Sequence, residues 1–223
     1  MKNVLITGIS RGIGKALAQK FLAEGYFVIG TSTSGKIDFT HENLVAYKLD
    51  LSSSKSITEC VTEIGKLGKQ IDILMNNAGA LFDDDETVIV IEKLRKTLEV
   101  NLIGTIDFTE QILPFVSKGG HIVYTSSSAG SISRTGHDGA HFEGYYPAYK
   151  ISKAALNMYM RTLALRLKDT ISVSAVHPGW VKTDMGGEDA DISPEEAAGY
   201  IYDLAISKVE SGNFWFKGEK FDW

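Results

Sequence analysis

A glycine-rich turn between an apolar run and a helical pattern, at the very start of the chain, constrains the fold more than any other feature. The run Val4–Thr7 is typical of a buried parallel strand, and the turn Gly8–Gly14 joins it to apolar residues with helical spacing. Gly8 suits a tight turn, Gly12 lets backbone approach a pyrophosphate, and Gly14 lets helix and strand pack closely. Since a helix N-terminus also offers free N–H groups to phosphate, this stretch predicts a dinucleotide-binding unit.

Strand and helix patterns alternate along the rest of the chain. Apolar strand patterns follow at 27–31, 44–49, 71–75, 121–125, 171–176 and 213–216. Helical patterns follow at 55–67, 88–116 (interrupted near Asn101 and Gly104), 147–167 with Pro147 in its first turn, and 194–206 with Ser193 as N-cap. This order predicts an α/β fold: a single-domain Rossmann-type doubly wound parallel sheet of about seven strands, with helices on both faces. We expect one dinucleotide-binding and catalytic domain over 1–223, with substrate-loop segments near 130–146 and 184–206.

Composition indicates the class of protein. The 223 residues are 43% hydrophobic and carry a net charge of −5, which suits a soluble domain with a sizeable core. The absence of a basic block argues against nucleic acid. The one cysteine, Cys60, excludes a disulfide within the chain and fits a reducing cytosol. No apolar run is long enough to span a membrane, and the strand directly after Met1 leaves no room for a targeting peptide, so we expect a cytoplasmic protein without a membrane partner.

The end of the second strand bears on the choice of dinucleotide. An NAD enzyme usually has Asp or Glu there to hold the ribose 2′-hydroxyl, whereas this chain has Ser32, Thr33 and Ser34 and no carboxylate before Asp38. Hydroxyls can bond to a 2′-phosphate that an acid would repel, and Arg11 could supply the matching charge. We therefore predict NADP(H) over NAD(H), against the alternative that Arg11 is only a solvated loop cation.

Tyr149 and Lys153 lie four residues apart, on one face of the helix that Pro147 opens. An unperturbed tyrosine has a pKa of about 10 and exchanges protons poorly at neutral pH. A nearby ammonium favours the phenolate and lowers that pKa, and a cationic nicotinamide would add to the effect. Such a pair is usually only a surface lysine beside a half-buried tyrosine, so its weight depends on the rest of the chain.

Polar residues follow three other strands, at the ends where a crevice is expected. They are Asp50-Leu51-Ser52, Asn76-Asn77-Ala78-Gly79 and Ser126-Ser127-Ser128. Asp50 with Ser52 could simply cap the next helix. Asn101 lies among apolar residues and must find partners, either as a structural bridge or as part of a proton relay. The acidic cluster Asp83–Glu86 is expected to stay in water and to complement the dipole of the helix that follows.

The loop 130–146 is long for a compact domain and rich in glycine and histidine, so it is expected to form a lid or rim. His137, His141 and Glu143 invite interpretation as a metal site. Their spacing matches no standard site, however, and we predict no metal.

Jointly these motifs resemble the short-chain dehydrogenase/reductase family over nearly the whole chain. The residues that carry the resemblance, in the family's order, are Thr7-Gly8-x-x-x-Gly12-x-Gly14, Asn76-Asn77-Ala78-Gly79, Asn101, Ser126–Ser128, Tyr149-x-x-x-Lys153 and Pro178-Gly179. Each motif is modest alone, but the set is highly specific. The stretches 144–150 and 177–187 and the tail 214–223 resemble the C-factor/sniffer-like carbonyl reductase branch.

The resemblance implies roles for these residues. Tyr149 would be the general acid in reduction and Ser127 would polarise the carbonyl. Lys153 would hold the nicotinamide ribose and lower the Tyr149 pKa, and Asn101 would hold a water that links Lys153 to solvent. Asp50 would meet the adenine, Asn76 and Gly79 the adenosine ribose, and Thr183 the carboxamide. The full set implied to contact NADP(H) is Gly8, Ser10, Arg11, Gly12, Ile13, Gly14, Ser32, Thr33, Asp50, Leu51, Asn77, Ala78, Gly79, Tyr149, Lys153, Pro178, Gly179, Val181 and Thr183.

Two of these assignments have competitors. The family spacing Ser-x-x-Gly, counted back from Gly130, selects Ser127, while Ser126 and Ser128 stay open. Tyr146 lies seven residues before Lys153, a spacing that enoyl reductases of the same superfamily use. Their glycine motif differs and they lack Asn-Asn-Ala-Gly, which favours Tyr149.

The sequence thus predicts an NADPH-dependent oxidoreductase that reduces a small aldehyde or ketone by hydride transfer. The alternative from another class is an NADP(H)-binding regulatory protein with little turnover, against which the complete Ser, Tyr, Lys and Asn set argues. A dehydrogenase of a hydroxysteroid or sugar alcohol would differ only in substrate and direction. The family commonly forms dimers and tetramers through the helices around 88–116 and 149–167, whereas the loop before Tyr149 could obstruct that packing and leave a monomer.

Overall fold

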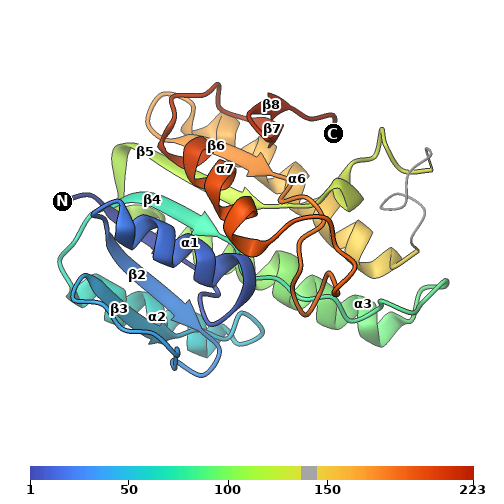
Figure 1. Cartoon of the computed structure of the whole chain (residues 1–223), viewed down its shortest axis with the longest axis horizontal. Coiled ribbons are helices and arrows are strands. Elements are labelled where there is room, and N and C mark those ends of the chain that lie inside the picture. The colour runs from blue at the N-terminus through green and yellow to red at the C-terminus, as the bar shows by residue number, and fades with distance from the viewer. Residues whose placement is uncertain (137–144) are drawn as a thin grey trace.

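The computed structural model describes residues 1–136 and 145–223. Within these ranges, eight strands form one sheet in the order β3-β2-β1-β4-β5-β6-β7-β8, with helices on both faces (Figure 1). Neighbouring strands are parallel except for β7 and β8. The strands are β1 (Asn3–Ile6), β2 (Phe27–Ser32), β3 (Leu44–Lys48), β4 (Ile71–Asn76), β5 (Val116–Thr125), β6 (Ser172–Val176), β7 (Asn213–Phe216) and β8 (Glu219–Lys220).

The helices form one layer on each face of the sheet and bury a separate apolar core. On one face α1 (Gly12–Ala23) packs against α7 (Pro194–Ile206), and Phe21 lies in that core. The other layer contains α2 (Ser54–Lys66), α4 (Thr105–Ile112) and α6 (Pro147–Leu167), and its core includes Phe108. Both faces of the strands are therefore covered, as a parallel sheet requires.

The strand order changes direction at β1, which pairs with β2 on one side and β4 on the other. In a parallel sheet such a switch point opens a crevice outside the carboxyl ends of the strands. Ile6 and Met75 pair at these ends, and Met75 in turn pairs with Val123 of β5. The glycine turn after β1, the turn at Asn77 and the serines after β5 therefore meet along one edge.

The predicted fold class is confirmed, and so are several helix boundaries. The helix α6 begins at Pro147 and ends at Leu167, and the Ser193 hydroxyl caps α7 by accepting from the Glu196 N–H. The helical zone after residue 88 is also broken where predicted. It consists of α3 (Ile91–Leu98), the π-helix η1 (Glu99–Gly104), α4, and the short 3₁₀ turn η2 (Leu113–Phe115).

Three details differ from the sequence prediction. The sheet has an eighth, antiparallel strand, and β5 begins at Val116 rather than at His121. The N-cap of α2 is Ser53, whose hydroxyl accepts from the Ser56 N–H. Ser52 is engaged elsewhere, because its N–H and its hydroxyl both donate to the Asp50 carboxylate, at 2.9 and 2.6 Å.

The sequence predicts neither a membrane span nor a metal site, and the described residues bear on both predictions. Among the helices of residues 1–136 and 145–223, none combines the length and the apolar character that a membrane crossing needs. The same ranges hold no group of three His, Cys, Asp or Glu side chains placed to bind a metal. The suspected metal residues His137, His141 and Glu143 lie outside them.

Candidate active site

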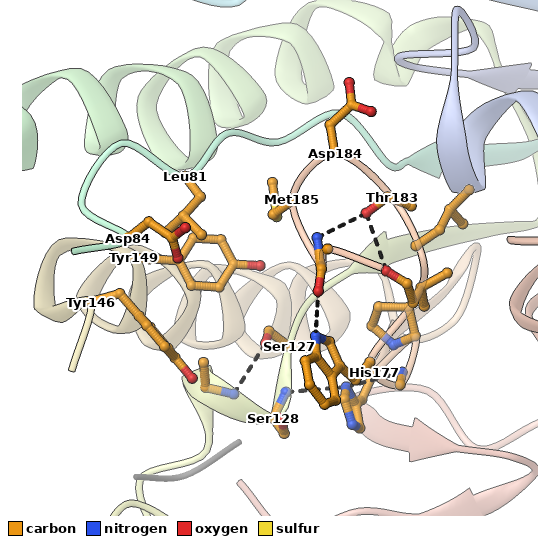
Figure 2. Close-up of a pocket in the computed structure, with 18 residues that line it drawn as sticks. Leu81, Asp84, Ser127, Ser128, Tyr146, Tyr149, His177, Thr183, Asp184 and Met185 are labelled. Carbon is orange, nitrogen blue, oxygen red and sulfur yellow. Dashed lines mark hydrogen bonds between the residues drawn. The ribbon is translucent and has the colours of Figure 1, made fainter. Parts of the chain in front are cut away.

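A cavity of about 420 Å³ opens at the carboxyl ends of the strands. Segments far apart in the sequence line it: Ile13 of the glycine turn, 127–129 after β5, Tyr146 and Tyr149 at the start of α6, and 177–181 with 183–187 after β6 (Figure 2). The predicted residues Ser127, Tyr149, Pro178, Gly179, Val181 and Thr183 are thus brought together around one space.

The glycine turn has the geometry that a diphosphate site needs. Gly8 and Gly12 have φ values of +75° and +55°, in the left-handed region that favours glycine. A Cβ on Gly14 would lie 2.0 Å from the Gly8 carbonyl oxygen, so only glycine fits there. The helix α1 begins after Arg11 without a side-chain cap and without an acidic residue in its first turn. Its first N–H groups and positive dipole end therefore suit an anion, so these residues fit a dinucleotide.

The Asn77 turn is tied to the first strand by a set of hydrogen bonds. The Thr7 hydroxyl accepts from the N–H groups of Asn77 and Ala78, each at 3.0 Å, and the Asn77 amide donates to the Thr7 carbonyl at 3.0 Å. The side chain of Asn76 takes no part, because its amide is buried and donates to Thr109 of α4 at 3.0 Å. The predicted contact of Asn76 with the adenosine ribose is therefore not available to its side chain.

Asn101 lies in the π-helix and is 1% exposed. Its amide forms a two-way clamp on Ala80, donating to the carbonyl oxygen and accepting from the N–H at 2.8 Å each, and it also donates to the Ser152 hydroxyl at 3.1 Å. The structural bridge considered from the sequence is thus present. The water relay through Asn101 stays a prediction.

Lys153 lies one helical turn after Tyr149 and is 4% exposed. Its ammonium donates to the Thr125 carbonyl oxygen at 2.9 Å and lies 5.5 Å from the centre of the Tyr149 ring. A Cβ on Gly79 would lie 3.5 Å from that ammonium and 3.5 Å from the Asn101 amide oxygen. The Asn-Asn-Ala-Gly turn is therefore in contact distance of the Lys153 ammonium. Burial lowers the pKa of Lys153 to about 8.

The balance at Tyr149 differs from the sequence prediction. Burial raises its pKa to about 12, and a hydrogen bond with the Ser127 hydroxyl only partly offsets that rise. The sequence could not predict this rise in pKa. A spacing of four residues shows that Tyr149 and Lys153 are close, but it does not show how far the phenol is removed from solvent. In this structure Tyr149 is a protonated phenol at neutral pH.

The three serines after β5 point to different partners. The Ser126 hydroxyl is buried and donates to the Asn157 amide oxygen at 2.6 Å. Ser128 is also buried, in the 3₁₀ turn η3 (Ser128–Gly130), and its N–H donates to the His177 ring at 3.3 Å. Ser127 is half-buried, accepts from the Ala129 N–H at 3.1 Å, and reaches Tyr149. The geometry therefore favours Ser127 as the serine beside the phenol.

The segment after β6 folds back over the glycine turn. A Cβ on Gly12 would lie 3.1 Å from the Thr183 methyl group. The Trp180 indole donates to the Gly186 carbonyl at 2.7 Å, and the Thr183 hydroxyl accepts from the Gly186 N–H at 3.1 Å (Figure 2). The hydroxyl of Tyr200 in α7 donates to the Pro178 carbonyl. These bonds hold the segment 177–187 at the mouth of the cavity, and we call this segment the strap.

The residues predicted to choose the dinucleotide lie along the same edge, nearer β2 and β3. The Ser32 hydroxyl is buried and donates to the Lys36 carbonyl at 2.9 Å, whereas Thr33 is exposed. Arg11 forms an ion pair with Asp184 of the strap, with side chains that are 78% and 70% exposed. Asp50 precedes the buried Leu51, and its bonds with Ser52 hold its pKa below the usual range.

Asp83 is a residue of the site that the sequence prediction misplaced. It is 1% exposed rather than in water, and one of its oxygens accepts from the Ala148 N–H at 2.6 Å. Its other oxygen, Oδ1, is buried and has no hydrogen-bond partner among the residues that the structure describes. Asp83 thus caps α6, directly beside Tyr149, instead of the helix that follows it in sequence. No local signal could reveal this, because the two residues lie 65 positions apart.

Tyr146 also faces the cavity. Its ring centre lies 6.2 Å from that of Tyr149, and its backbone has a φ of +21°, which is unusual for a residue other than glycine. Burial raises its pKa. Both tyrosines are thus near the reacting space, although the hydrogen bond with Ser127 belongs to Tyr149.

Comparison with known proteins places the chain in a family. A family model for the short chain dehydrogenases matches residues 2–192. The chain belongs to the short-chain dehydrogenase family. It is therefore an oxidoreductase by descent, built on the fold and with the motif order that its sequence predicts.

Relatives also confirm the predicted branch. The NADPH-bound carbonyl reductase from chicken fatty liver matches with a TM-score of 0.88 and 27% identity, covering 100% of this chain and 94% of that one. The carbonyl reductase Sniffer of Drosophila melanogaster matches with a TM-score of 0.86 and 27% identity, covering 100% of both chains. C-signal of Myxococcus xanthus is 32% identical over 165 residues, which cover 69% of this chain and 93% of that protein. The predicted resemblance to the C-factor/sniffer-like branch is thus confirmed.

Proposed function

We propose that the chain is an NADPH-dependent reductase that converts an aldehyde or ketone to an alcohol, with Tyr149 as the general acid. The observation that carries the proposal is the meeting of Ser127 and Tyr149 at a cavity bordered by the glycine turn, with the Lys153 ammonium 5.5 Å from the Tyr149 ring centre. The NADPH-bound carbonyl reductase among its structural relatives supports both the cofactor and the reaction class.

The proposed chemistry needs one hydride and one proton. NADPH, when bound, would supply the hydride for the carbonyl carbon. The hydroxyls of Ser127 and Tyr149 bind the carbonyl oxygen, on which negative charge develops. Tyr149 then transfers its phenolic proton to that oxygen, and the alcohol forms. Burial keeps the proton on the phenol until this step, since the Tyr149 pKa is about 12.

Lys153 has a positioning and an electrostatic role in this proposal. Its ammonium, 5.5 Å from the Tyr149 ring centre, stabilises the phenolate that remains after proton transfer. It also suits the ribose hydroxyls of the nicotinamide half. Burial lowers its pKa to about 8, so the charged form prevails at neutral pH but is lost in mild alkali.

The cofactor would be held along the whole edge of the sheet. The first turn of α1 suits the diphosphate, the Asp50 carboxylate suits the adenine amino group, and Thr183 of the strap suits the carboxamide. Because the Ser32 hydroxyl is bonded to Lys36, the preference for the 2′-phosphate rests on Arg11 and Thr33. Arg11 would exchange Asp184 for the phosphate, a small loss because exposed ion pairs contribute little.

A regulatory protein that binds NADP(H) with little turnover is the second candidate. The similarity to C-signal of Myxococcus xanthus favours it. Against it stands the alignment of Ser127 with Tyr149, since a protein that only binds the nucleotide has no need of a hydroxyl pair over the nicotinamide site.

One assay separates the two functions. Purified protein is mixed with NADPH or NADH and a panel of activated aldehydes, quinones and diketones, and the loss of nicotinamide absorbance is followed. Turnover that prefers NADPH and disappears in Tyr149→Phe is expected. Tight NADPH binding without turnover across the panel would favour the regulatory protein. Turnover that survives Tyr149→Phe and is lost in Tyr146→Phe would move the acid to Tyr146.

The setting of this activity is also part of the proposal. We expect a small-molecule substrate and a cytoplasmic location, in agreement with the single buried thiol, Cys60. The choice between a monomer, dimer and tetramer stays a prediction.

A further inference from the structure

The substrate end of the cavity has walls that are apolar and aromatic. Leu81, Tyr146 and Met185 line it around Tyr149 (Figure 2), and Trp180 is a further aromatic residue of the cavity lining. The Trp180 ring is held in place by its hydrogen bond to the Gly186 carbonyl. Such walls bind the body of an aldehyde or ketone by burial of apolar surface, without selecting a charge.

The charges around the cavity are not balanced. Among its described lining residues, two are carboxylates, Asp84 and Asp184, and none is a lysine or an arginine. Asp184 lies at the glycine-turn end, where it pairs with Arg11. Asp84 lies at the other end, on the Leu81 side of Tyr149. An anionic substrate bound against the apolar walls would therefore face a carboxylate rather than a cation.

The field of Asp84 extends into the cavity. Its charge adds to the rise of the Tyr146 pKa, behind the larger effect of burial. The two cations near this end lie in different positions. The Lys150 ammonium is 5.2 Å from the Tyr146 ring centre but does not line the cavity, and the Lys153 ammonium is buried against Thr125.

We propose that the pocket selects uncharged or cationic aromatic aldehydes and ketones over anionic ones, and that Asp84 is the residue that sets this preference. The inference rests on the proposed reductase function and narrows its substrate class. Carbonyl compounds with a carboxylate or phosphate near the reacting group bind more weakly because of repulsion. Two unit charges that act across the width of a solvated pocket change binding about three- to tenfold.

The test uses benzaldehydes of one shape and different charge. The probes are 4-carboxybenzaldehyde, its methyl ester and 4-(trimethylammonio)benzaldehyde, with kcat/KM measured in the wild type and in Asp84→Asn. Comparing each probe between the two proteins cancels its intrinsic reactivity. We expect Asp84→Asn to raise the carboxylate-to-ester ratio of kcat/KM about three- to tenfold and to lower the ammonium-to-ester ratio by a similar factor.

Asp85→Asn is the matched control. It removes the same charge one residue further along, but Asp85 does not line the cavity and its charge acts on Lys93. Both ratios should stay within about twofold of the wild type. An unchanged ratio in Asp84→Asn, or an equal change in Asp85→Asn, would overturn the role of Asp84 while leaving carbonyl reduction intact.

Binding measurements separate the selectivity of the pocket from the reductase function, even without turnover. The matching benzyl alcohols, with the same three substituents, are titrated into the NADP⁺-loaded protein by calorimetry. Suppose that the affinity for the three alcohols depends on their charge, that this dependence disappears in Asp84→Asn, and that the protein reduces none of the aldehydes. This result would support the pocket selectivity and contradict the reductase function. Equal affinity for all three alcohols would contradict the selectivity.

Discussion

The two ends of the crevice satisfy their polar groups to different degrees. At the cofactor end, the Thr7 hydroxyl accepts from the N–H groups of Asn77 and Ala78, and the Asn77 side-chain amide donates to the Thr7 carbonyl. At the substrate end, Lys153 is desolvated, one buried oxygen of Asp83 has no partner within residues 1–136 and 145–223, and Tyr146 has a strained backbone. Polar groups that are paired in this way stabilise a fixed surface, whereas buried polar groups without full pairing cost stability. Substitutions at the two ends should therefore affect different properties.

The largest expected effect concerns the serine beside Tyr149. Ser127→Ala removes a hydroxyl that we place on the carbonyl oxygen, and kcat should fall about 100- to 1,000-fold, as for other donors to a developing oxyanion. Steady-state kinetics with NADPH would measure it.

Ser126→Ala is the neighbouring comparison. Its hydroxyl bonds to the buried Asn157 amide, so the loss should appear in the free energy of unfolding, by about 1–2 kcal/mol, more than in kcat. A larger loss of kcat in Ser126→Ala than in Ser127→Ala would reassign the serine.

Next in size is the stability cost of Lys153. Burial lowers its pKa from 10.5 to about 8, so the unfolded chain holds this proton more firmly than the folded one. The cost is full below pH 8 and disappears as the pH rises toward 10.5. At pH 7, Lys153→Met should therefore be more stable than the wild type, with a free energy of unfolding higher by about 1–3 kcal/mol. The variant should nevertheless lose activity.

Chemical denaturation at pH 7 and near pH 10 checks this prediction. The advantage of Lys153→Met should shrink at the higher pH. Lys168→Met, at the exposed end of the same helix, should show no such change. A Lys153 variant that is less stable at both pH values would mean that the ammonium is well compensated in the fold.

The cofactor end is tested through Arg11. Arg11→Ala should weaken NADPH binding about 10- to 100-fold, the contribution of a charge-assisted bond to phosphate, and should change NADH binding less than about twofold. Fluorescence titration of both nucleotides measures this. Equal weakening of the two, or tighter binding of NADH by the wild type, would remove the NADP assignment.

The smallest effect is expected at Asp83, which positions the first turn of α6. Asp83→Ala leaves the Ala148 N–H without its acceptor and should lower kcat about tenfold, with an NADPH dissociation constant close to that of the wild type. Asp83→Asn keeps an oxygen at this place and should recover most of the rate. If kcat falls equally in Asp83→Ala and Asp83→Asn, the rate depends on the charge of Asp83 rather than on its positioning of α6.

The sequence could predict what depends on short spacings. The glycine turn, the pair Tyr149 and Lys153, the start of α6 at Pro147 and the Ser193 cap are all set by neighbours within one or two helical turns. The alternation of strands and helices then fixes the sheet, and the sheet brings Ser127 to Tyr149.

What the sequence could not predict depends on contacts between distant segments. The burial of Asp83 requires the position of Ala148, and the rise of the Tyr149 pKa requires the depth of its ring in the site. The commitment of the Asn76 side chain to Thr109 follows from the packing of α4 on the sheet. Ser52 and Ser53 are equally good caps by type, and only the bond of Ser52 to Asp50 decides between them.

The most direct test of the account measures two properties of one sample of Tyr149→Phe. These are the dissociation constant for NADPH and the single-turnover rate with a reactive aldehyde. If the two ends of the crevice are separable, the dissociation constant stays within about twofold of the wild type while the rate falls at least about 100-fold. A parallel loss of binding and rate, or a rate that survives the loss of the phenol, would contradict the account.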